Sequence, residues 1–164
     1  MKFDIELKQE ALPSCTYTVL REAVRAVSIK GEKVLLIQTK DGDVKFPGGG
    51  VEASESHTDT LLREIIEETG YIRSEVLQKA GVVVEVKEDE FNQNQSFQMT
   101  SHYYWCNIHT DVRTCQQLDR YETDLSFKPV WLTIEEAIEM NEQAQNLEIS
   151  WLERETAVLK ALRK

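Results

Sequence analysis

Long apolar runs and paired cysteines are both missing from this 164-residue sequence. No run approaches the ~20 apolar residues that a membrane-spanning helix needs, so we expect no membrane partner. The opening residues, MKFDIELKQEALPS, lack the apolar core of a secretory signal. The three cysteines, Cys15, Cys106 and Cys115, have neither a disulfide nor a zinc-site spacing. We therefore expect a cytoplasmic protein with reduced thiols.

A basic surface is also missing. The chain has 29 acidic residues against 19 lysines and arginines, which gives a formal net charge of −10. Binding of a nucleic-acid duplex relies on clustered positive charge, so we do not expect such a partner. A small anionic substrate fits this charge only if a cation mediates its binding. Repeats, linkers and low-complexity segments are absent as well, and we expect residues 1–164 to form a single domain.

Apolar and β-branched runs indicate where the regular structure lies. Strands are predicted at 21–29, 33–39, 44–46, 82–88, 97–108 and 129–133. The first two are expected to form a hairpin around Gly31. Helices are predicted at 57–69, 134–142 and 149–163, the first with Ser56 as its N-cap and Gly70 just past its end. This mixture of strands and helices predicts an α/β or α+β layered fold, without fixing the order of the strands.

The stretch LLREIIEETGY ends the first of these helices with concentrated negative charge. Glu64, Glu67 and Glu68 have helical i, i+3 and i+4 spacing, so we expect them on one face, opposite the apolar stripe. Like charges at this spacing cost roughly 0.2–0.5 kcal/mol per pair, and the C-terminal end of a helix disfavours negative charge. Arg63 is the one basic residue expected to offset them. Either the face is simply solvated or a bound cation relieves the repulsion, and the spacing alone leaves both open.

A run of three glycines, Gly48, Gly49 and Gly50, precedes this helix in FPGGGVEASES. Glycine permits positive φ angles and a close approach of the backbone to a ligand. A lone glycine run is more often a flexible turn. The Lys–Ser/Thr pair and the GxGxxG spacing of standard phosphate loops are both absent. This run becomes informative through the number of residues that separate it from the acidic helix.

Joined, the two stretches resemble the Nudix box. Gly49 is followed after five residues by Glu55 and, after seven more, by REIIEETGY; Tyr71 departs from the aliphatic residue that is usual at the last position. The matching positions are Gly49, Glu55, Arg63, Glu64, Ile65, Glu67, Glu68 and Gly70. The resemblance implies a Nudix-type α/β/α sandwich with a mixed sheet and an acidic loop–helix motif.

The resemblance also implies a reaction, the metal-dependent hydrolysis of a nucleoside diphosphate linked to another group. A nucleoside triphosphate, including its oxidised forms, is the first candidate substrate, and a nucleotide sugar or a dinucleotide is the alternative. A catalytically silent nucleotide sensor is a further alternative, although such domains lose box carboxylates that this sequence retains. The residues that discriminate between substrates lie in loops that vary among proteins of one fold, so the sequence does not identify the substrate.

Metal and catalytic roles follow from the resemblance position by position. Glu67 and Glu68 are the implied metal ligands, Glu64 is a ligand or the base that activates water, and the Gly49 carbonyl completes the coordination. Arg63 is implied to hold a carboxylate in place by ion pairing. Carboxylates without histidine or cysteine select Mg²⁺, with Mn²⁺ as a substitute. Because family members differ in the base, candidates also lie outside the box: Glu85, Glu88, Asp89, Glu90 and Glu122.

Substrate contacts are less readable from the sequence. Arg25 is our choice for a phosphate contact, because a basic residue that faces an acidic, metal-loaded site can pair with an anion; the alternative is a salt bridge at the rim. The backbone of the glycine run is expected to approach the substrate. His57 and His102 show no partner pattern and receive no role.

Assembly is predicted from the last helix. Trp151, Leu152 and Leu159 have little polar cover in the sequence, so this helix is expected to pack across a two-fold axis in a homodimer. The alternative is that these side chains pack on the chain's own sheet.

Overall fold

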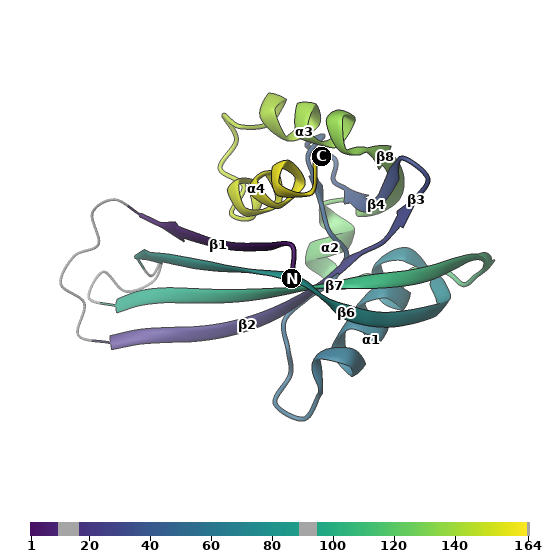
Figure 1. Cartoon of the computed structure of the whole chain (residues 1–164), viewed down its shortest axis with the longest axis horizontal. Coiled ribbons are helices and arrows are strands. Elements are labelled where there is room, and N and C mark those ends of the chain that lie inside the picture. Colours follow the sequence, from purple (N-terminus) through teal and green to yellow (C-terminus); the bar gives the residue numbers. More distant parts are fainter. Residues whose placement is uncertain (10–16, 89–94, 164) are drawn as a thin grey trace.

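The computed structural model describes residues 1–9, 17–88 and 95–163 of the chain. Its elements follow the order β1 (Phe3–Lys8), β2 (Tyr17–Val27), β3 (Ile29–Lys30), β4 (Lys33–Gln38), β5 (Val44–Lys45), α1 (His57–Thr69), β6 (Tyr71–Glu88), β7 (Gln95–Arg113), α2 (Arg120–Asp124), β8 (Lys128–Thr133), α3 (Ile134–Gln143) and α4 (Leu152–Leu162). Strands and helices are mixed along the chain, so the predicted α/β class is confirmed (Figure 1).

Two sheets form the centre of the fold. The first has the order β1-β6-β7-β2. Strands β6 and β7 are antiparallel, while β1 and β2 run parallel to their neighbours, so this sheet is mixed, as predicted. The second sheet contains β3, β4 and β5, and β8 pairs with β4 in antiparallel fashion. Pairing between distant segments, in addition to the antiparallel pairing of consecutive strands, therefore organises the fold.

Helices cover the sheets from two sides (Figure 1). An apolar cluster on the α1 side includes Val24, Ala26 and Leu61. A larger cluster on the side of α3 and α4 includes Val27 and Leu159. Strand β2 contributes to both clusters because successive side chains of a strand point to opposite faces. This arrangement is the predicted α/β/α sandwich.

The predicted hairpin around Gly31 is wrong in its larger part. Gly31 makes the turn with a φ of 60°, but only Ile29 and Lys30 pair with β4. Strand β2 instead joins β7, with Tyr17 opposite Gln95. A β-branched run predicts a strand but carries no information about its partner, which here lies far along the chain.

Other element boundaries also differ from the prediction. Strand β6 begins at Tyr71, shortly after the helix, and not at the predicted residue 82. Its first half was not predicted because it mixes polar and apolar residues, which hides the strand pattern. Strand β1 and the five-residue helix α2 were not predicted, since each is too short for a clear periodicity. Helix α4 begins at Leu152, not at residue 149.

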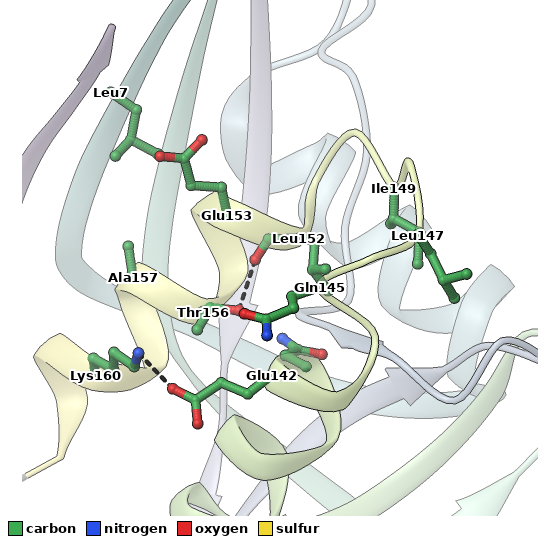
Figure 2. Close-up of a pocket in the computed structure, with 11 residues that line it drawn as sticks. Leu7, Glu142, Gln145, Leu147, Ile149, Leu152, Glu153, Thr156, Ala157 and Lys160 are labelled. Carbon is green, nitrogen blue, oxygen red and sulfur yellow. Dashed lines mark hydrogen bonds and ion pairs between the residues drawn. The ribbon is translucent and has the colours of Figure 1, made fainter. Parts of the chain in front are cut away.

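Helix α4 packs inside the chain instead of presenting an open apolar face. Leu152 and Leu159 are buried, and Lys160 of α4 forms an ion pair of 2.6 Å with Glu142 of α3. Figure 2 shows this pair beside a cavity of about 480 Å³ that the two helices help to line. The predicted homodimer therefore gains no support from this helix. In the part of the chain that the structure describes, no helix is long and apolar enough to cross a membrane.

Candidate active site

Helix α1 begins and ends at the predicted residues because both ends are capped. Ser56 accepts a hydrogen bond from the backbone N–H of Asp59, and the Asp59 side chain accepts one in return, which completes a capping box. Gly70 adopts the left-handed conformation with a φ of 75°. The segment after β7 covers the exposed carbonyls of the last turn, where the Gln117 N–H donates to the Glu67 carbonyl at 2.8 Å.

Glu64 and Glu68 lie within the buried face of α1, where they are 8% and 1% exposed. Lys45 of β5 forms an ion pair of 2.8 Å with Glu68 Oε1, and the Gly48 N–H donates to Glu68 Oε2 at 2.7 Å. The predicted placement opposite the apolar stripe is therefore wrong for these two glutamates. A buried carboxylate requires polar partners, and β5 and the glycine run supply those of Glu68, while Arg63 supplies that of Glu64.

Arg63 connects three carboxylates. Its Nε and Nη2 donate to the two oxygens of Glu55 at 2.8 and 2.9 Å, while Nη1 donates to Glu64 at 2.9 Å and to Glu67 at 3.0 Å. The hydrogen bonds from Arg63, with a further one from Thr60, lower the pKa of Glu55 to about 2. A bidentate pair fixes both side chains geometrically. Arg63 thus has the contacts that its predicted positioning role requires.

Two glycines of the run, Gly48 and Gly49, lie so close to β2 and α1 that side chains would not fit there. At Gly48, with a φ of 139°, a Cβ atom would overlap the Val24 carbonyl, and at Gly49 it would overlap the Glu64 carboxylate. The Gly49 carbonyl accepts the Val24 N–H at 3.0 Å, which leaves one lone pair for the predicted coordination. The backbone at Gly48 and Gly49 thus lies close to Val24 and Glu64, and its approach to a substrate stays a prediction.

Glu122, from α2, is the candidate outside the box that the fold brings to these carboxylates. Oxygen atoms of Glu64, Glu68 and Glu122 lie within 4.8 Å of one another. Glu64 and Glu122 line a cavity of about 420 Å³, and Glu67 and Arg63 are also on its wall. The capping box of α2 fixes the side-chain orientation of Glu122 locally, while the path of the chain after β7 brings α2 to α1.

Negative charge is crowded in this cluster. Burial and the neighbouring Glu68 raise the pKa of Glu64 to about 7, although Arg63 acts in the opposite direction. Burial also raises the pKa of Glu122, against a hydrogen bond to the backbone of Asp119. A cation bound among these oxygens would relieve the repulsion, and an oxygen-only donor set suits a hard cation such as Mg²⁺. The residues present therefore fit the metal that the resemblance implies.

The candidate phosphate contact, Arg25, and the candidate base Glu85 both form ion pairs with residues of α4. Arg25 is buried, donates a hydrogen bond to the Gly48 carbonyl and lies 3.9 Å from Glu155, so it braces the glycine run from inside the fold. Glu85 forms an ion pair of 2.6 Å with Arg154. Neither residue lines the cavity beside Glu122.

The remaining base candidates follow one another in the chain. Glu88 is the last residue of β6, and its backbone N–H donates to the Gln9 side chain at 3.0 Å. Asp89 and Glu90 lie outside the described residues.

Sequence reasoning missed Lys45 and Gln116. Gln116 bridges the carbonyls of Glu68 and Phe127, so it joins the end of α1 to the start of the second sheet's β8. The signal for Lys45 is present in the sequence, because a lone lysine stands three residues before Gly48 in a short apolar strand. No sequence pattern marks Gln116, whose role depends on the path of the chain after β7.

Comparison with known proteins now identifies the family. A family model described as "NUDIX domain" matches residues 19–154. A curated relative from Lactococcus lactis subsp. cremoris, named "Probable DHNTP pyrophosphohydrolase", is 30% identical over 122 residues, which cover 73% of this chain and 68% of the relative.

Solved structures have the same fold. A NUDIX hydrolase from Nitrosomonas europaea is 18% identical with a TM-score of 0.54, over 86% of this chain and 88% of that one. An ADP-ribose pyrophosphatase from Streptococcus suis is also 18% identical, with a TM-score of 0.53 over 88% of this chain and 92% of that one. The family model and the curated relative confirm the predicted family: the chain belongs to the NUDIX family and is a hydrolase that acts on phosphoanhydride bonds.

Proposed function

We propose that this protein hydrolyses a nucleoside diphosphate linked to another group, in a reaction that depends on Mg²⁺, with Mn²⁺ as a substitute. The observation that carries the proposal is the convergence of Glu64, Glu68 and Glu122 beside a cavity of about 420 Å³. When bound, a hard cation neutralises charge on phosphoryl oxygens and lowers the pKa of a water ligand.

The residues of the chain have separable roles in this proposal. Glu64 and Glu68 hold the cation, with Glu67 beside them on the cavity wall. Arg63 keeps Glu64 and Glu67 in position through its hydrogen bonds. Glu122, which reaches the cavity from a separate helix, accepts the proton of the attacking water. Water attacks one phosphorus of the phosphoanhydride, and the P–O bond to the leaving phosphate breaks. The products are two separate molecules that each carry one side of the broken linkage.

The substrate proposal is a nucleoside triphosphate or a compound of the DHNTP type, for which the relative with 30% identity is named. A nucleotide sugar or a dinucleotide is the second choice. A silent sensor is disfavoured because the box carboxylates are present and lie together. We also propose a cytoplasmic location, with which the free thiols of Cys106 and Cys115 agree.

The test is a panel of nucleoside triphosphates, DHNTP, ADP-ribose, a nucleotide sugar and a dinucleotide, each incubated with Mg²⁺ and assayed for released phosphate products. We expect hydrolysis of at least one triphosphate, its loss in excess EDTA, and a fall of two orders of magnitude or more in Glu68→Gln. Circular dichroism in EDTA should show that the fold persists. Full activity in EDTA would overturn the metal-dependent mechanism, and an inactive wild type with a Mg²⁺-induced rise in melting temperature would favour the sensor.

A further inference from the structure

A second polar cluster lies outside the acidic cavity and joins three elements. Glu22 comes from β2, His57 is the first residue of α1, and His102 comes from β7. Glu22 Oε1 lies 3.2 Å from His57 Nε2 and 2.6 Å from His102 Nε2. The two imidazole rings are 4.6 Å apart between their centroids, and the three ligand-type atoms lie within 4.8 Å of one another. Two imidazoles thus point their Nε2 atoms at a single carboxylate oxygen.

The other nitrogen of each ring also has a partner. His57 Nδ1 lies 2.8 Å from the Tyr104 hydroxyl, and His102 Nδ1 lies 2.7 Å from Lys79 Nζ. Such outer contacts fix the orientation of a ligating imidazole in metal sites. A Tyr104 oxygen that accepts the Nδ1 proton leaves the His57 Nε2 lone pair directed at Glu22. The orientation of both rings is therefore set before any ligand arrives.

We propose that Glu22, His57 and His102 form a binding site for a divalent transition-metal cation, with Zn²⁺ as the best fit. Imidazole nitrogen with one carboxylate suits Zn²⁺ and related metals, whereas Mg²⁺ prefers oxygen ligands. The two clusters therefore differ in selectivity, with Mg²⁺ expected at Glu64 and Glu68 in the acidic cluster. Three protein ligands leave a coordination position for water, and the Glu22 and His57 side chains are 49% and 30% exposed, which gives an ion access.

Lys79 should lower the affinity of this site for a cation. With a metal on Nε2, the His102 ring carries its proton on Nδ1, so two donors would face each other and the ammonium would repel the ion. Lys79 is partly exposed and can turn toward solvent, at the cost of one hydrogen bond. Replacement of Lys79 by methionine should therefore strengthen metal binding, which a purely structural hydrogen-bond network does not predict.

A metal at this position would tie the start of α1 to the sheet. The Val51 N–H donates to the Glu22 carbonyl at 3.0 Å, and the next residue, Ala23, pairs with Gly50. Glu22 is thus attached to the chain between the glycine run and α1. Occupancy should stabilise the folded protein by mass action and raise its melting temperature.

The test is a Zn²⁺ titration against a chromophoric chelator, with millimolar Mg²⁺ present to fill the acidic site. We expect wild type to bind one equivalent, Glu22→Gln and His102→Gln to lose at least tenfold in affinity, and Lys79→Met to gain several-fold. His109, the third histidine of the chain, is exposed, so His109→Gln is the matched control and should bind as wild type does.

Nitrogen-15 NMR of the three imidazoles supplies a second readout. Zn²⁺ should shift the Nε2 resonances of His57 and His102 and leave those of His109 unchanged. No binding by wild type at 100 µM Zn²⁺, equal affinity in the ligand variants, or weaker binding in Lys79→Met would each overturn the proposal. Glu68→Gln separates this site from the proposed activity, because it should abolish hydrolysis and retain the Zn²⁺ response.

Discussion

Replacement of Lys45 by methionine tests the electrostatic organisation of the acidic helix. Lys45 Nζ lies 2.8 Å from Glu68 Oε1, and the two side chains are 10% and 1% exposed. At that distance the gross Coulomb attraction is about 6 kcal/mol with an effective dielectric constant of 20. Removal of one partner from a buried pair costs about 3–5 kcal/mol net. The Lys45 ammonium also lies 4.3 Å from the centroid of the Phe127 ring. Methionine is an unbranched side chain without the charge, so the lost charge dominates the change.

The same substitution should increase the response to metal. Without Lys45, Glu68 has lost its cation, so Mg²⁺ binding relieves a larger penalty in the variant than in wild type. We expect the free energy of unfolding in EDTA to fall by about 3–5 kcal/mol, and the Mg²⁺-induced rise in melting temperature to be larger than in wild type. Urea denaturation followed by circular dichroism gives the first quantity, and thermal melts with and without Mg²⁺ give the second.

Lys160→Met is the matched control. Its ion pair with Glu142 is even shorter, at 2.6 Å, but the side chains are 46% and 50% exposed. Exposed pairs contribute about 0–1 kcal/mol. If Lys45→Met and Lys160→Met lower the free energy of unfolding by the same small amount, the reasoning about burial is refuted.

Three further predictions follow from the described residues. Glu68→Gln should lower the stability of the metal-free protein by about 3 kcal/mol, measured by urea denaturation, because it leaves the Lys45 ammonium buried without its partner; greater stability would contradict this. In a Cys15→Ser background, maleimide should label the exposed Cys115 and spare folded Cys106, whose pKa burial raises to about 12, and equal labelling in a mass spectrum would reject that protection. Light scattering at micromolar concentration decides between the predicted homodimer and the monomer that the burial of α4 favours.

The sequence predicts the helix of the Nudix box better than it predicts the residues that pack around that helix. The caps at Ser56 and Gly70 are local signals, and α1 begins and ends where they place it. The repulsion among the glutamates in the last turn of α1 is also inferred from local spacing. It predicts that the loss of one glutamate charge stabilises the helix. The structure reverses that sign for Glu68, because Lys45 arrives from another element. Local spacing gives helix ends reliably but does not give tertiary partners.

The rest of the site depends on chain paths that no local pattern encodes. Glu122 was one of several acidic residues outside the box, and only the course of the chain from β7 into α2 places it beside Glu64. His57 and His102 lie far apart in the sequence and showed no partner pattern. The parallel pairing of β2 with β7 sets Val24 opposite His102 and brings that ring to Glu22, and the position of α1 brings His57 there as well. Residues joined by sheet pairing over such distances are invisible to periodicity.

The pairing of early strands with late ones also determines when the protein can fold during synthesis. Strand β2 needs residues 95–105, and β4 needs Lys128–Thr133. The Nudix box is therefore synthesised before either partner exists. At 5–20 residues per second, the roughly 60 residues between α1 and β8 take about 3–12 s to make. During that interval the apolar side of α1 has no complete sheet to cover it, so the nascent chain is expected to rely on chaperones that bind exposed apolar segments.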